Sequence, residues 1–137
     1  MSLQGVIDEI VGALQPVVTE IPSLQVYPYW NDNPSPPAID IYPGDPFQDG
    51  AGFGSLNVEA FFTVRARVSI GDARAATELL LRLLDPADAA SVRTAIENAN
   101  AGAIAEGSPG GFRQYADDVP GAGRMIGCEW RIRRFLE

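Results

Sequence analysis

A strict alternation of apolar and polar residues runs through positions 56–70 and constrains the fold more than any other part of the chain. Every even position from Leu56 to Ile70 is apolar, and every odd position except Phe61 is polar. A period of two is typical of a β-strand with one buried face and one face in water. Such a strand would span roughly 50 Å, far more than the usual length of about five or six residues. A small domain rarely needs so long a strand for its own core, so its length indicates a role in assembly.

Shorter elements are expected on both sides of this strand. Ser2 is a suitable N-cap for an amphipathic helix over residues 2–15, which Pro16 ends. Further helices are expected to begin with Asp72 and Asp85 as N-caps. The remaining strands are expected over residues 24–29, 38–42, 112–115 and 125–136, and the loops and turns over residues 30–37, 43–54, 100–111 and 117–123.

This order of elements, α-β-β-β-α-α-β-β, predicts a single domain over residues 1–137 with an α+β fold. We expect an antiparallel or mixed sheet with one long strand and with helices packed on one face. The apolar positions of the last strand, Ile126, Cys128, Trp130 and Ile132, should face the core. Cys128 is then expected to be a buried, inert thiol, and a single cysteine excludes an internal disulfide and favours an intracellular origin.

The chain contains no histidine. This excludes Ser-His-Asp and Cys-His triads, histidine-ligated zinc and imidazole acid–base catalysis. The glycine-rich segment 50–54 leads into a strand, whereas phosphate-binding loops lead into a helix. Asp45 and Asp49 lack the carboxylate spacing of a calcium loop, and the pair Asp117 and Asp118 is typical of a solvated turn. We therefore predict no catalytic residue, no metal and no cofactor.

The net charge is −8, and all ten cationic side chains are arginines. Proteins that bind duplex DNA normally carry a basic patch and a basic balance, so the charge argues against tight binding to DNA. An acidic surface is also one that DNA can slide past without sticking, although solubility alone would explain the same charge. No apolar run is long enough to cross a membrane, and no membrane partner is expected.

The candidate interface residues are arginines and phenylalanines. Four arginines lie on polar parities of the long strand and the last strand, and they form one patch if these strands are neighbours. Phe61 interrupts the polar face, and two phenylalanines lie in the loop at 43–54, which we expect to be mobile in an isolated subunit and ordered on assembly. A solvated sheet face is the alternative for the arginines, and folding back onto the same subunit is the alternative for the loop rings. The candidates are Phe47, Phe53, Phe61, Arg65, Arg67, Arg131 and Arg133.

The order and spacing of these segments resemble the tail terminator (tail completion) proteins of long-tailed phages, especially phages of actinobacterial hosts. The resemblance covers most of the chain and depends on order and spacing, since no single motif is diagnostic. After the N-terminal helix, the matching pieces are Pro-Pro-Ala-Ile-Asp-Ile at 36–41, a Gly/Asp loop, the long strand ending in Val68-Ser-Ile-Gly-Asp72, the run Ala75-Ala-Thr-Glu-Leu-Leu-Leu-Arg-Leu-Leu-Asp-Pro86, the run Ser91-Val-Arg-Thr-Ala-Ile96, and a closing strand.

The resemblance implies a virion structural protein of the tail and neck region, assembled in the host cytoplasm. It would form a homo-oligomeric ring, usually a hexamer, that caps the finished tail tube and joins it to the head-side connector. Its partners would be the major tail tube protein and the connector or stopper protein, and DNA would pass through the ring without specific binding. The family has no catalytic residues to carry over.

Two other functions remain open at this stage. One is a head-closure or connector protein of the same neck, which is a structural relative in the same particle. The other is a small enzyme that uses carboxylates, and a carboxylate pair in a deep pocket would favour it.

Overall fold

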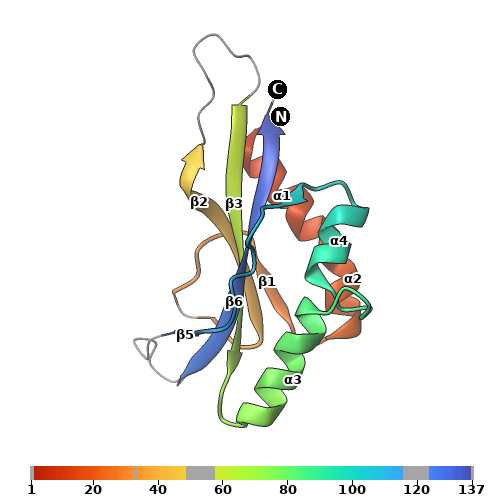
Figure 1. The fold of residues 1–137 in the computed structure, drawn as a ribbon, viewed down its shortest axis with the longest axis vertical. Coiled ribbons are helices and arrows are strands. Elements are labelled where there is room, and N and C mark those ends of the chain that lie inside the picture. The colour runs from red at the N-terminus through yellow and green to blue at the C-terminus, as the bar shows by residue number, and fades with distance from the viewer. Residues whose placement is uncertain (1, 33, 49–57, 116–123, 137) are drawn as a thin grey trace.

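The structure is a computed structural model that describes residues 2–32, 34–48, 58–115 and 124–136. A six-stranded sheet forms one layer, and the helices lie together against one of its faces (Figure 1). The strands are β1 Gln25–Tyr27, β2 Ala38–Gln48, β3 Val58–Ser69, β4 Ala103–Ile104, β5 Arg113–Tyr115 and β6 Met125–Leu136. The helices are α1 Leu3–Ala13, α2 Gln15–Glu20, α3 Ala73–Leu84 and α4 Val92–Asn98.

The strand order is β1-β2-β3-β6-β4, with β5 also paired to β6. The pair β1–β2 is parallel and the other pairs are antiparallel, so the sheet is mixed. The predicted α+β fold, with a mixed sheet and helices on one face, is therefore confirmed. Strand β3 lies at the centre, between β2 and β6, and its register places each odd residue opposite an odd residue of β6.

The even residues of β3 face the helices and form the centre of the core. Phe62 and Val64 are completely buried, as are Ile132 on β6 and Leu80 on α3. Burial of a side chain of this size stabilises the fold by about 1.5–3 kcal/mol. The prediction that the even positions of the alternation face the core is thus confirmed for the described residues of β3.

The expected long strand is present as β3, and the last strand, β6, has its predicted length, but β2 is longer than predicted. Residues 43–48 of the predicted loop continue β2, which pairs with β3 as far as Gln48 opposite Ala60, across a shift in register that begins at Pro43. A proline disrupts a sheet only where a neighbouring strand needs its missing N–H. Since β1 pairs with β2 only at 38–40, Pro43 has no such neighbour among the paired strands. The rest of the predicted loop, residues 49–54, lies outside the described residues.

The helix starts show which capping predictions hold. The Ser2 hydroxyl accepts a hydrogen bond from the Gly5 N–H at 3.0 Å, and the Asp72 carboxylate accepts one from the Ala75 N–H at 3.1 Å, so both predicted N-caps are confirmed. Pro16 ends α1 as expected, but it also occupies the first turn of α2, which was not predicted.

The helix predicted to start at Asp85 begins six residues later. Ser91 is its N-cap and accepts from the Thr94 N–H at 3.1 Å. Asp85 and Asp88 each accept a hydrogen bond from a backbone N–H two residues ahead, which forms turns instead of a helix. The segment 100–111 is not wholly irregular either, because β4 pairs with β6 there. The turn predicted at 117–123 lies outside the described residues.

Candidate functional site

The face of the sheet opposite the helices contains a buried ionic cluster centred on Asp40. Asp40 lies on β2 directly opposite Arg65 on β3, and the Arg65 guanidinium donates to both carboxylate oxygens at 3.0 and 2.5 Å. Arg67 donates to the same carboxylate at 3.2 Å and to the carbonyl oxygen of Asn31 at 2.8 Å. All three charged side chains are buried. Because bidentate guanidinium–carboxylate pairs are geometrically specific, this cluster favours a single register between β2 and β3.

The two arginines of the cluster are not equivalent. Burial lowers the pKa of a guanidinium, but at Arg65 the hydrogen bonds and charge of Asp40 outweigh burial, and the pKa is raised. At Arg67, burial and the neighbouring charge of Arg65 outweigh the attraction of Asp40, and the pKa is lowered. One carboxylate between two cations leaves an excess of positive charge, and Arg67 is the less favourably placed of the two.

Three aromatic rings surround the Arg65 guanidinium. Its central carbon lies 4.7 Å from the ring centre of Trp30, 5.1 Å from that of Tyr42 and 5.6 Å from that of Tyr115. Contacts of this kind stabilise a desolvated cation by roughly 1–2 kcal/mol. Since Trp30 follows β1, Tyr42 belongs to β2 and Tyr115 to β5, this aromatic shell holds three separate segments against β3.

Glu129 on β6 connects the aromatic shell to the other half of the sheet. Its carboxylate accepts a hydrogen bond from the Tyr42 hydroxyl at 3.2 Å and pairs with Arg113 at 3.2 Å. Burial, followed by the charge of Glu129, raises the pKa of Tyr115, and burial likewise raises the pKa of Tyr42. Both phenols therefore keep their protons well into the alkaline range.

Towards the other end of the same face, arginines lie next to phenylalanines. The Arg131 guanidinium lies 3.6 Å from the ring centre of Phe61, which is buried. Arg133 lies 6.0 Å from the ring centre of Phe135 and 3.6 Å from the Glu59 carboxylate. Phe135 is 60% exposed, more than any other large apolar side chain that the structure describes. The end of β6 therefore presents an accessible ring beside a cation.

The structure brings the predicted arginines onto one face but divides them into two groups. Strands β3 and β6 are neighbours, as a shared patch requires. The expectation that this face of β3 lies in water is wrong for Arg65, Arg67 and Phe61, because the aromatic shell, Asp40 and Arg131 cover them. Arg133 remains exposed and Arg131 is half-buried.

The two predicted loop phenylalanines remain undecided. Phe47 belongs to β2, where the structure gives the course of the backbone, and Phe53 lies outside the described residues. Their role in an interface, and the ordering of the loop on assembly, stay predictions.

Sequence reasoning missed the residues that organise this face. Asp40 was not among the candidates, although its position between Ile39 and Ile41 was the available signal, because an acid that is buried needs a cationic partner. Trp30 is an aromatic residue in a Pro- and Asn-rich loop, the same signal that singled out Phe47 and Phe53. No local pattern in the sequence shows that Tyr115 and Glu129 would meet Tyr42 from distant strands.

An apolar groove lies at the edge of β2, where the start of α1 meets the segment after β1. It has a volume of about 360 Å³, and its walls include Leu3, Ile7, Tyr29 and Trp30. Leu3, Tyr29 and Trp30 are 45%, 55% and 56% exposed. Exposed apolar groups gathered in this way are typical of a binding surface.

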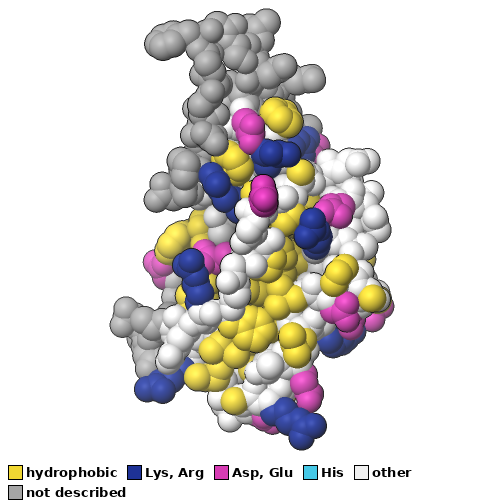
Figure 2. Space-filling model, viewed as in Figure 1, with side chains coloured by type: hydrophobic (Ala, Val, Ile, Leu, Met, Phe, Trp, Pro, Cys, Tyr) yellow, Lys and Arg dark blue, Asp and Glu magenta, His cyan; other side chains and the backbone are white. Residues whose placement is uncertain are grey.

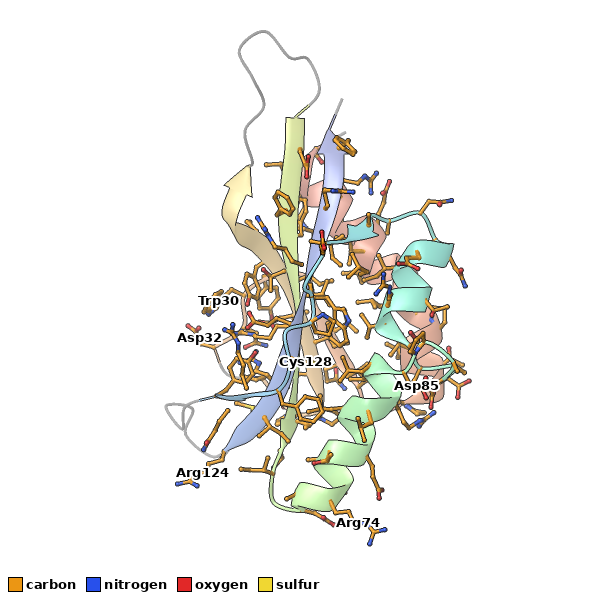
Figure 3. The ribbon with its side chains drawn as sticks, viewed as in Figure 1. Trp30, Asp32, Arg74, Asp85, Arg124 and Cys128 are labelled. Atoms are coloured by element: carbon orange, nitrogen blue, oxygen red, sulfur yellow. The ribbon has the colours of Figure 1, made fainter. Side chains whose placement is uncertain are left out.

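Two exposed carboxylates accompany the groove. Asp8 accepts a hydrogen bond from Gln4, which lines the groove, at 3.2 Å, and Asp32 accepts one from the indole N–H of Trp30. Figure 3 shows Trp30 and Asp32 together beside the sheet. The groove therefore combines an apolar floor with negative charge at its rim.

A second apolar area lies away from this groove, on the β6 side of the sheet. Figure 2 shows hydrophobic side chains gathered between β6 and the helices α3 and α4, with charged side chains around them. Apolar surface is thus present both at the groove beside β2 and between β6 and the helices.

Neither a scan against models of protein families nor a search of curated proteins finds a match for this chain. Among the described residues, no group of three or more His, Cys, Asp or Glu side chains is arranged to hold a metal ion. Within the same residues, no helix combines the length and the apolar character needed to cross a membrane.

Proposed function

We propose that this protein is a structural virion subunit that forms a ring on the phage tail tube and joins the tube to the head-side connector. The observation that carries the proposal is the exposure of six large apolar side chains around the sheet and helices. These residues are Leu3, Tyr29, Trp30, Leu81, Phe112 and Phe135. Leu3, Tyr29 and Trp30 lie together at the groove beside β2, and exposed apolar groups gathered in this way are typical of an interaction surface, so the geometry supports an assembly function.

The charges of the site support the same proposal. The carboxylate of Asp40 and that of Glu129 pair with arginines of the same subunit. Carboxylates that are paired with arginines in this way hold the strands in position. Their charge is already compensated, so they are poorly placed to act on a substrate. The resemblance in element order then narrows an assembly protein to a tail terminator, and a net charge of −8 suits a ring through which DNA must move.

The experiment is labelling of phage particles and tail tubes. Gold-labelled protein is mixed with tail tubes that lack a cap, with complete tails and with DNA-filled heads, and each sample is viewed by negative-stain electron microscopy. We expect label at one end of the uncapped tubes only, and we expect bound protein to stop further tube growth.

The same experiment separates the related neck function. Label at the portal vertex of the heads, with none on the tubes, would assign the protein to head closure. Label on neither particle would overturn both assignments.

A further inference from the structure

Two exposed surfaces with complementary chemistry lie on opposite sides of the central strand. The first is the groove beside β2, with Leu3, Tyr29 and Trp30 exposed and with Asp8 and Asp32 at its rim. The second is the end of β6. It presents Phe135, 60% exposed, and Arg133, whose side chain is 47% exposed. Strands β2 and β6 flank β3, and Phe135 is not among the residues that line the groove of its own subunit.

We propose that the groove of one subunit receives the Phe135 end of β6 from a second copy of this chain. This inference deepens the proposed function and rests on it, since it names the contact between neighbouring subunits of the ring. The Phe135 ring fills the space between Leu3, Tyr29 and Trp30, where aromatic packing is favourable. Arg133, which also pairs with Glu59 of its own subunit, then lies near the acidic rim, where a cation is favourable. Phe112 likewise lies beside an exposed arginine, but Phe135 is the more exposed ring, at 60% against 41%, and is therefore the favoured insert.

The contact depends on side chains and not on extension of the sheet. The Pro37 carbonyl, just before β2, accepts from the Gln25 N–H at 3.0 Å, so the backbone groups of every second residue from Pro37 to Pro43 point towards the β1 edge. At Pro43 the N–H that an added strand would need is absent. Proline at such a position blunts an edge against strand addition, so an inserted ring is the favoured mode of contact.

The geometry also gives the symmetry of the assembly. Groove and insert are different surfaces, so the contact is heterologous, and repeated copies form a ring when the rotation closes.

The first test uses two variants that each disable one surface. Phe135→Glu removes the insert, and Leu3→Glu with Tyr29→Glu removes the apolar groove. All three positions are at least 45% exposed, so folding is retained, which thermal melting verifies. By light scattering at up to about 100 µM, where micromolar contacts are occupied, wild type forms closed oligomers and each variant is monomeric. An equal mixture of the two variants forms a one-to-one dimer, because one intact groove and one intact insert remain.

The matched control is Leu81→Glu, a substitution on α3 with similar exposure at 53%, which leaves the oligomer unchanged. A second test uses the fact that the only native cysteine, Cys128, is buried. Tyr29→Cys with Phe135→Cys forms disulfide-linked oligomers under mild oxidation, whereas Leu81→Cys with Phe135→Cys does not. A monomeric wild type, an assembling Phe135→Glu variant, or a mixture that stays monomeric would each overturn the inference.

Failure of this inference is distinguishable from failure of the proposed function. If wild type caps tail tubes but Phe135→Glu caps them equally well, the ring uses other surfaces and only the inference fails. If the mixing experiment succeeds but no variant or wild-type protein binds a tail tube, the contact is real and the proposed function fails.

Discussion

At the scale of single residues, Asp40 determines how the helix-free face is built. Its carboxylate is the shared partner of two buried guanidinium groups, and Arg65 in turn holds the aromatic shell. A buried charge that loses its partner is far less favourable than one that was never buried. The stability of the face therefore depends more on this one carboxylate than on any exposed pair.

The first prediction concerns this carboxylate. Asp40→Ala leaves two buried cations without compensation and should lower the free energy of unfolding by about 3–5 kcal/mol, a large part of a total of about 5–15 kcal/mol. Asp8→Ala, at an exposed acid on α1, should change it by no more than about 0.5 kcal/mol. Urea denaturation measures both, and equal midpoints for the two variants would mean that the cluster does not stabilise the fold.

The second prediction follows from three weak acids with raised pKa values, the buried Cys128 and the half-buried Tyr42 and Tyr115. Burial raises the pKa of Cys128 from its ordinary value of 9.0 to about 12, and it raises those of Tyr42 and Tyr115 above their ordinary value of 10.0. The folded protein keeps these protons while the unfolded chain loses them. Because the unfolded state then binds fewer protons, the free energy of unfolding falls as the pH rises.

This loss should begin near pH 9.0 and steepen above pH 10.0, where unfolded thiols and phenols titrate. Denaturation curves between about pH 8 and about pH 11 measure it. The variant Tyr42→Phe with Tyr115→Phe should be less stable at neutral pH but should lose less stability on going to alkaline pH. A wild-type protein of constant stability over this range would contradict the prediction.

At the scale of elements, regular periodicity was predictable and turn chemistry was not. The long alternations identified β3 and β6, and Asp72 identified the start of α3, because each depends on neighbours in the chain. The extension of β2 through residues 43–48 was not predictable from local composition, since it depends on pairing with β3. Asp85 was misread as a helix cap because the same side-chain hydrogen bond also forms an isolated turn.

The same distinction applies to the candidate site. Parity placed four arginines on one face, because parity is a local property of a strand. It could not show which of them would be buried, since that depends on Trp30 and Tyr115, which reach Arg65 from other segments. The sequence therefore predicted that the four arginines share one face of the sheet. Only the tertiary structure showed that the cluster at Arg65 is internal and that the one at Arg133 is accessible.

The third prediction tests the two faces of β3. Phe62 is fully buried against the helices, whereas its neighbour Thr63 points to the other face and is partly exposed. Phe62→Asp places an unpaired charge in the core and should unfold the protein at room temperature, because its cost of several kcal/mol rivals the total stability. Thr63→Asp should melt within a few degrees of wild type. Thermal melts of both variants decide the matter, and equal melting temperatures would mean that the strand faces are misassigned.

At the scale of the whole molecule, the arginines are largely occupied by acids of the same chain. At least eight of the ten arginines form ion pairs within the described residues, among them Arg65, Arg67, Arg74, Arg82, Arg93, Arg113, Arg133 and Arg134. A phosphate backbone would have to displace these carboxylates before it could gain a contact. With a net charge of −8, the long-range field also repels DNA.

The last prediction is therefore that the protein does not retain duplex DNA at about 0.15 M salt, even when assembled. Gel mobility shift with the assembled protein measures this, with a known duplex-binding protein as the positive control. The variant Glu78→Gln with Glu97→Gln frees Arg74 and Arg93 from their exposed pairs and lowers the negative charge by two, so it should show more retention than wild type at low salt. Because binding to phosphates weakens steeply with salt, that gain should vanish at about 0.15 M. Tight wild-type binding at this salt concentration would mean that arginines leave their carboxylates for DNA, and it would contradict a passive channel through the proposed ring.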